Sequence, residues 1–87
     1  MDFTQEFESE LRRLYTELEL KDYGRAGGFI DTVQGARDKL EANPSLGEIF
    51  SLTSEGVPLF ELRVLNAWRL IYSRGDAAAL IWIEEID

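Results

Sequence analysis

The hydrophobic pattern of the chain changes its period at Asn43-Pro44. Before this point apolar residues recur every three to four positions, as on one face of an α-helix, and after it they alternate, as in a half-buried strand. The proline ends the helical half because it cannot continue a helix. A chain of 87 residues holds a single domain, at 1–87. The pattern therefore predicts an α+β fold, a two-helix hairpin packed on a three- to four-stranded antiparallel sheet.

Two helices are predicted in the first half, at residues 3–20 and 28–42. Apolar residues share one narrow stripe of the first segment: Phe3, Phe7, Leu11, Leu14 and Leu18. Those of the second also share a face: Phe29, Val33, Ala36 and Leu40. The intervening segment 21–28 contains three glycines, which predicts the turn between the helices.

Strands are predicted at residues 48–52, 59–65, 68–73 and 79–85, with turns near 66–67 and 74–76. The last two strands carry apolar residues on both faces, whereas a sheet covered by helices on one side should alternate apolar with polar residues. Two explanations stay open. Either loop 44–58 folds over the second face, or that face is an apolar patch that a partner covers.

The composition excludes several kinds of chemistry. The chain has no cysteine and no histidine, so thiolate zinc sites, cysteine nucleophiles and histidine bases are ruled out, and no metal or cofactor is expected. The net charge of −8 repels nucleic acid at long range and favours a protein partner, although contact with a ribosome or mRNA stays open. The acidic N-terminus and the short apolar runs predict neither a secretory signal nor a membrane span, and therefore a cytoplasmic protein.

Two motifs follow one another in the second half. Phe60-Glu61-Leu62-Arg63 is followed by Trp68-Arg69-Leu70-Ile71-Tyr72 and then by the apolar run 79–83. This order resembles the RelE/ParE toxin superfamily, including its HigB-like and phage-borne branches. Members carry a (W/Y)xLR strand, a (Y/W)R(I/L)xY strand and an apolar third strand. The resemblance spans nearly the whole chain by element order, and about fifteen residues by motif.

The resemblance implies a compact toxin fold that is held by an antitoxin. RelE-type members cut mRNA in the ribosomal A site, and ParE-type members inhibit DNA gyrase. By the same resemblance, Arg63, Arg69 and Tyr72 are the candidates for a phosphate-facing catalytic site. The chain departs from the family pattern in three respects. The basic positions before Leu62-Arg63 are Phe60 (or Leu59) and Glu61, the strand before the first helix is missing, and the chain ends in the acidic run 83–87.

Each candidate residue has a simpler alternative role. Arg63 and Arg69 can pair with Glu61, Glu84 or Glu85 across the sheet, which we favour because the surroundings are acidic. Tryptophans in strands are more often core or interface anchors than platforms for bases. We therefore predict a partner-binding set in the last two strands: Trp68, Ile71, Ile81, Trp82 and Ile83.

Two functions follow from these residues. The first is a RelE/ParE-like toxin-type protein of a toxin–antitoxin system that acts on translation or another host target through protein partners. The second is a non-enzymatic acidic binding protein, such as a degenerate toxin or phage-type inhibitor, that holds a host protein. Whether the chain is an enzyme stays open, because fold alone does not license an activity. A homodimer is a further alternative.

Overall fold

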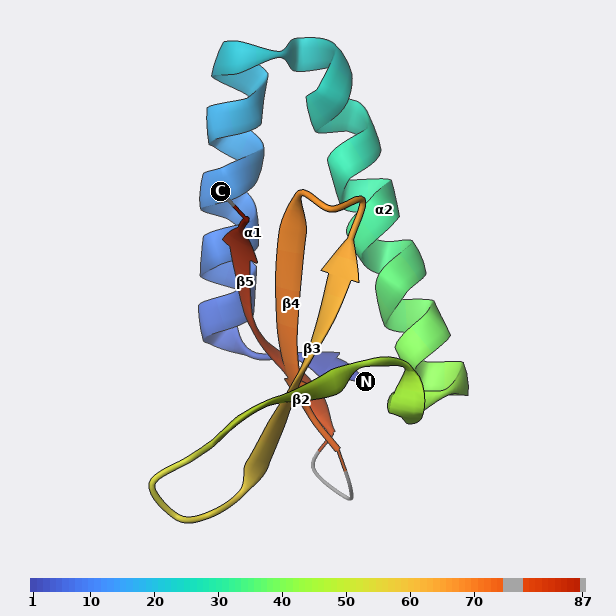
Figure 1. The fold of residues 1–87 in the computed structure, drawn as a ribbon. Helices are drawn as coiled ribbons and strands as arrows, with labels where there is room; N and C mark the ends of the chain where they lie inside the picture. The colour runs from blue at the N-terminus through green and yellow to red at the C-terminus, as the bar shows by residue number, and fades with distance from the viewer. Residues whose placement is uncertain (75–77, 87) are drawn as a thin grey trace.

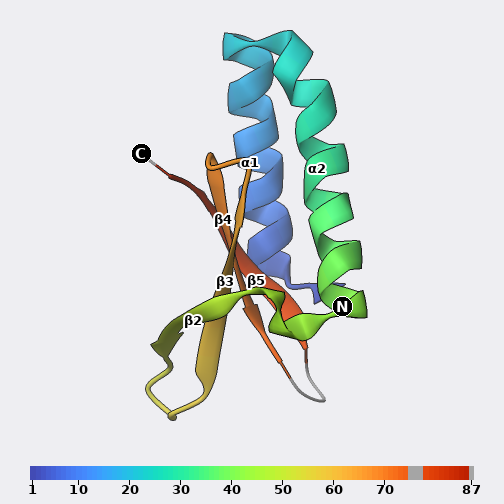
Figure 2. The same cartoon turned by 45° about the vertical axis from the view of Figure 1, so that its right-hand side comes forward.

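The computed structural model describes residues 1–74 and 78–86. Two helices lie side by side on one side of a twisted five-stranded sheet (Figure 1). Turning the molecule shows that both helices lie on the same side, and within residues 1–74 and 78–86 no helix covers the opposite side (Figure 2). The elements run in the order β1 (Asp2–Phe3), α1 (Gln5–Lys21), α2 (Tyr23–Ala42), a short 3₁₀ helix η1 (Pro44–Leu46), β2 (Glu48–Leu52), β3 (Pro58–Val64), β4 (Trp68–Ser73) and β5 (Ala79–Glu85).

The α+β class is confirmed, but the predicted strand count and purely antiparallel pairing are wrong. The sheet order is β1-β5-β4-β3-β2, and β1 runs parallel to β5 while the other pairs are antiparallel. The strand before the first helix, which was predicted to be missing, is therefore present as Asp2–Phe3. The next residue, Thr4, anchors this strand to β5, because its backbone N–H donates to the Leu80 carbonyl over 2.9 Å. The hydroxyl of Thr4 also caps α1 by accepting a hydrogen bond from the Phe7 N–H. A strand of two residues is too short to show the alternating hydrophobic pattern from which strands are predicted.

The predicted turn at residues 21–28 is also wrong, because α2 begins at Tyr23. Asp22 alone separates the helices. Its backbone N–H donates to the Leu18 carbonyl, which ends α1, and its side chain accepts from the Arg25 N–H, which begins α2. An aspartate at this position satisfies orphan N–H groups of the new helix. The glycines of the segment therefore lie inside α2, whose interior position Phe29 is buried against the sheet.

The core lies between the helices and the sheet. Phe7 and Leu14 from α1 and Phe29, Val33 and Leu40 from α2 are almost completely buried. The sheet contributes Val64, Trp68, Leu70, Tyr72, Leu80 and Ile83 to the same cluster. The ring centroids of Phe29 and Trp68 are 4.7 Å apart, which joins α2 to the start of β4. The helical faces predicted from the sequence are the faces that form this core.

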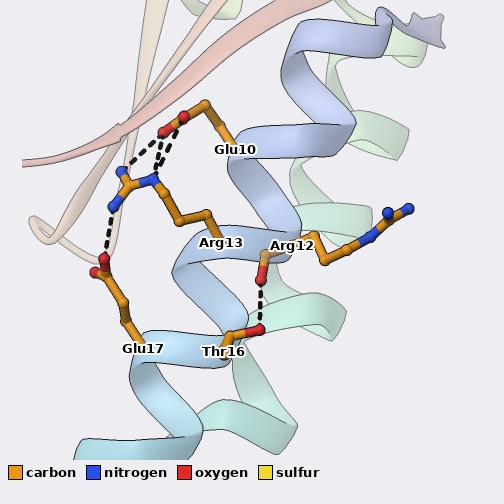
Figure 3. A network of polar contacts seen from close by, with 5 residues as sticks. All are labelled: Glu10, Arg12, Arg13, Thr16 and Glu17. Carbon is orange, nitrogen blue, oxygen red and sulfur yellow. Dashed lines mark hydrogen bonds and ion pairs between the residues drawn. The ribbon is translucent and has the colours of Figure 1, made fainter.

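The outer face of α1 is polar and held by its own ion pairs. Figure 3 shows Arg13 between Glu10 and Glu17, with N–O distances of 2.8 and 2.6 Å, while Arg12 points away from the network. These pairs are spaced three and four residues apart, which places their side chains on one face of the helix. Exposed pairs of this kind contribute little to stability, so this face is best described as solvated.

None of the helices in the described part of the chain is long and apolar enough to cross a membrane. The described residues also contain no group of three or more acidic side chains that could hold a metal ion. The turn predicted at 74–76 and the acidic end at Asp87 fall wholly or partly outside the described residues.

The turn between β3 and β4 contains a leucine in an unfavourable backbone conformation. Leu65 and Asn66 have φ values of 56° and 53°, and the turn is closed by a bond from the Ala67 N–H to the Val64 carbonyl. Two successive positive φ values are typical of a type I′ turn, in which asparagine and glycine are preferred. Leu65 is also 72% exposed, so it gains little by burial.

We therefore expect Leu65→Asn to stabilise the protein by about 1 kcal/mol, since asparagine adopts this conformation at lower cost. Urea unfolding followed by circular dichroism would measure the change. Leu65→Val, which is β-branched and strains the turn further, is the matched control and should be destabilising. Equal stability of all three proteins would contradict the assignment.

Candidate functional site

The side of the sheet away from the helices carries four of the eight predicted site residues, Arg63, Arg69, Ile71 and Trp82. Along β4, Trp68, Leu70 and Tyr72 join the core. Because side chains of a strand alternate between faces, Arg69 and Ile71 point the other way. The strand register then places their neighbours on the same side. We call this surface the uncovered face and define it by Phe50, Glu61, Arg63, Arg69, Ile71, Trp82 and Glu84.

The centre of the uncovered face is apolar. Ile71 lies opposite Glu61 on one neighbouring strand and Trp82 on the other, and these neighbours leave only 3% of it exposed although no helix lies above it. Trp82 itself is 37% exposed. Phe50 adds a second exposed aromatic ring at the edge of this surface. A large aromatic side chain left partly in water beside a buried isoleucine is typical of a protein interface.

Arg69 is held between two carboxylates on this face. Its Nε lies 2.6 Å from a Glu61 oxygen, and its Nη1 donates to Glu84 over 2.6 Å. The hydrogen bond to Glu84 raises the pKa of Arg69, and the negative charge of Glu61 raises it further against the opposing effect of burial. The guanidinium carbon also lies 5.5 Å from the centre of the Phe50 ring. Arg69 therefore stays charged, and its positive charge is already neutralised by the protein.

Arg63 lies directly opposite Arg69 in the strand register but is much more open to solvent. Its side chain is 57% exposed, compared with 24% for Arg69, and its one ion pair in the described residues is a 3.6 Å contact with Glu61. An open hollow of about 420 Å³ beside it is lined by Glu48 and Glu61 as well as by Arg63. Two carboxylates against one guanidinium make this hollow a poor site for a phosphate.

The two arginines should therefore respond differently to substitution. Arg69→Ala leaves the carboxylates of Glu61 and Glu84 close together without their shared cation, so we expect a lower midpoint of thermal unfolding. Arg63→Ala removes a weak exposed pair and relieves a like-charge contact, so we expect a change within about 1 °C. Differential scanning calorimetry would measure both. A larger effect at Arg63 than at Arg69 would contradict the described network.

The third predicted catalytic residue, Tyr72, lies on the opposite side of the sheet from the two arginines. It is three positions from Arg69 along β4, so the two side chains point to different faces. Tyr72 is fully buried, and its hydroxyl donates to the Pro44 carbonyl over 2.8 Å and accepts from the Gly47 N–H over 2.9 Å. Arg74 supports the same segment by donating to the Gly47 carbonyl. Tyr72 therefore holds the start of β2 in place.

The residues predicted to bind a partner are divided in the same way. Trp68 and Ile83 are buried under the helices and belong to the core. Ile71 and Trp82 face the other side. Ile81 is the extra residue of a β-bulge in β5, because Ile71 pairs with Trp82 while Tyr72 pairs with Leu80, and it is partly exposed. The bulge explains why simple alternation along β5 fails as a guide to its faces.

Loop 44–58 does not close over the uncovered face as a lid. It forms η1, the edge strand β2 and the turn that leads into β3. Phe50 was not among the residues predicted from the sequence. A second register shift, between Ile49 and Ser51, leaves Phe50 without a regular partner in β3. The sequence feature that could have identified Phe50 is an aromatic residue within the short predicted strand 48–52.

Comparison with protein-family models, with curated proteins and with solved structures finds no match to this chain, so its function is argued from its own residues.

Proposed function

We propose that this protein is a binding module that holds another protein against the uncovered face of its sheet, on a RelE/ParE-like fold. The observation that carries the proposal is the environment of Trp82, which stays 37% exposed beside the buried Ile71 on a side that no helix covers. Tryptophan is the residue type most enriched among interface anchors. The partner is expected to present an apolar patch with basic residues around it, because the chain carries a net charge of −8.

The electrostatics of the face support binding over phosphate chemistry. Of its charged residues, Glu61 and Glu84 already neutralise Arg69, and Glu61 also contacts Arg63. The Nε and Nη1 groups of Arg69 are directed at these carboxylates, whose negative charge opposes the approach of a phosphate. The hydroxyl of Tyr72 is occupied by backbone groups on the other side of the sheet. Neither group is placed to stabilise charge that develops on a cleaved phosphodiester.

The experiment is a comparison of variants in affinity capture from a bacterial lysate. Trp82→Glu places a charge in the proposed interface, and Tyr23→Glu makes the same type of change at an exposed aromatic residue of α2. We expect a partner retained by the wild-type protein and by Tyr23→Glu to be lost with Trp82→Glu. Retention by Trp82→Glu, with circular dichroism showing a native fold, would contradict the proposal.

A toxin-type role in a toxin–antitoxin system is the second candidate. It is supported by the resemblance of the strand motifs and by the order of elements, in which a strand precedes the first helix, as it does in the RelE/ParE superfamily. In this setting the partner is an antitoxin or a host target.

Induced expression in bacteria, with primer extension on a translated reporter mRNA, tests the toxin-type role. Growth arrest without mRNA cuts is the expected result for a toxin that acts through protein binding. Ribosome-dependent cuts that disappear with Arg69→Ala would identify a nuclease instead.

A further inference from the structure

The outer edge of β2 is an open sheet edge made of exposed, largely apolar residues. All five residues of the strand are exposed, and Ile49 and Leu52 are exposed to 66% and 64%. In the sheet order β2 has a neighbour only on the β3 side. At the far edge the sheet ends in β1, which is two residues long. Lysine and proline are two of the features that discourage pairing at an edge strand, and β2 has neither, although it contains Glu48 and a bulge at Phe50.

The segment that forms this edge carries only negative charges, while Arg63 and Arg69 lie on the inner side of β2, toward β3 and β4. Between Lys39 and Arg63 the chain has no lysine or arginine, but it has four glutamates: Glu41, Glu48, Glu55 and Glu61. Glu48 lies in β2 itself, Glu55 lies in the turn that leads to β3, and Glu61 pairs with Glu48 in the register. Glu61 is engaged by Arg69, whereas Glu48 and Glu55 are exposed and make no ion pair within the described residues. The edge therefore presents backbone donors and acceptors, apolar side chains and negative charge together.

We propose that β2 is the docking strand for an extended segment of a partner protein in which apolar residues alternate with lysine or arginine, and that this segment adds to the sheet as a sixth strand. The inference rests on the proposed function and specifies how the partner binds. Main-chain hydrogen bonds supply affinity in such strand addition, and alternate side chains supply specificity. The basic residues of the segment would face the glutamates, which a second acidic copy of this chain cannot do.

The position of Phe50 connects this edge to the uncovered face. The register shift between Ile49 and Ser51 leaves Phe50 out of regular pairing with β3, and its ring lies against Arg69 on the uncovered face. A strand added beside β2 would therefore extend the uncovered face, and the apolar residues on that side of the added strand would continue the surface that contains Phe50 and Trp82. One partner can contact both regions without any rearrangement of the core.

The test uses a short acetylated peptide of alternating lysine and valine, added to the ¹⁵N-labelled full chain. We expect slower hydrogen exchange at β2 amides, an affinity that falls as NaCl is raised, and no effect from the same peptide with glutamate in place of lysine. Ile49→Lys, which puts a cation on the edge, should abolish the protection, whereas Tyr23→Lys should not. Absence of protection with millimolar peptide, or protection equal for both peptides, would overturn the inference.

The captured partner separates this inference from the proposed function. Loss of the partner with both Ile49→Lys and Trp82→Glu supports strand addition that extends onto the uncovered face. Loss with Trp82→Glu and full retention with Ile49→Lys overturns strand addition and leaves the proposed function standing. Retention with both variants overturns the two together.

Discussion

Replacing Trp68 with alanine should lower the free energy of unfolding by about 3–5 kcal/mol, the usual cost of truncating a buried tryptophan. Trp68 is only 4% exposed, its ring packs against Phe29 at 4.7 Å, and the guanidinium of Arg25 lies 5.7 Å from its centre. Removing the indole leaves a cavity between α2 and the start of β4. A domain of this size typically has about 5–15 kcal/mol of stability, so the variant is expected to be close to unfolding.

Trp82 is the matched control because it is the second tryptophan of the chain and lies on the other face of the sheet. Trp82→Ala should cost less, about 2 kcal/mol, since more than a third of this residue is already in water. Denaturant unfolding of both variants measures the difference. Similar losses for the two substitutions would mean that the uncovered face is as essential to the core as the helix-covered face, which contradicts the described burial.

Gly47→Ala should destabilise the protein by about 3 kcal/mol. A Cβ at this position would lie 2.4 Å from the Glu61 carbonyl oxygen and 2.5 Å from the Tyr72 hydroxyl. The first of these neighbours is backbone in the adjacent strand and cannot move without breaking the β2–β3 pairing. The methyl group would also disturb the bond from the Gly47 N–H to Tyr72. Urea unfolding would measure the loss, and β2 amides would exchange faster with solvent.

Two further variants isolate the cause. Gly35→Ala is the control, because a Cβ there has no neighbour within 4 Å and the helix interior prefers alanine to glycine by about 1 kcal/mol. Gly47→Ala in a Tyr72→Phe background should recover only part of the loss, since the hydroxyl is gone while the Glu61 carbonyl and the ring carbon Cε1 of residue 72, 2.7 Å from the Cβ, remain. Full additivity of Gly47→Ala and Tyr72→Phe would contradict a direct contact between these two residues.

Much of the fold follows from periodicity alone. The stripes through Phe7 and Phe29 predicted both helices and the faces that they bury, and the alternation around Leu62 predicted β3 and its hairpin with β4. Glycine content misled the reading of the helix junction, because tertiary burial of Ala26 and Phe29 outweighs the weak helix propensity of three glycines. The strand β1 was missed because it depends on pairing with β5, a contact more than seventy residues away in sequence.

The existence of the candidate surface was predictable from the sequence, but its detailed composition was not. Apolar residues on both faces of the last strands indicated that a second surface existed, and acidic neighbours indicated that Arg69 would be paired, as it is with Glu61 and Glu84. Side chains alternate along β4, which places Arg69 and Tyr72 on opposite faces of the sheet. The sequence motif that contains both residues does not indicate that they lie on different faces. The position of Trp82 depends on the bulge at Ile81, and no local pattern predicts a bulge.

Hydroxyl-radical footprinting of the chain with its captured partner would show whether the partner binds at the uncovered face. We expect oxidation of Trp82 and Phe50 to fall in the complex, while that of the exposed Tyr23 on α2 stays as it is in the free protein. Protection of Tyr23 with unchanged oxidation of Trp82 and Phe50 would place the partner on the helices and rule out the uncovered face as the binding surface.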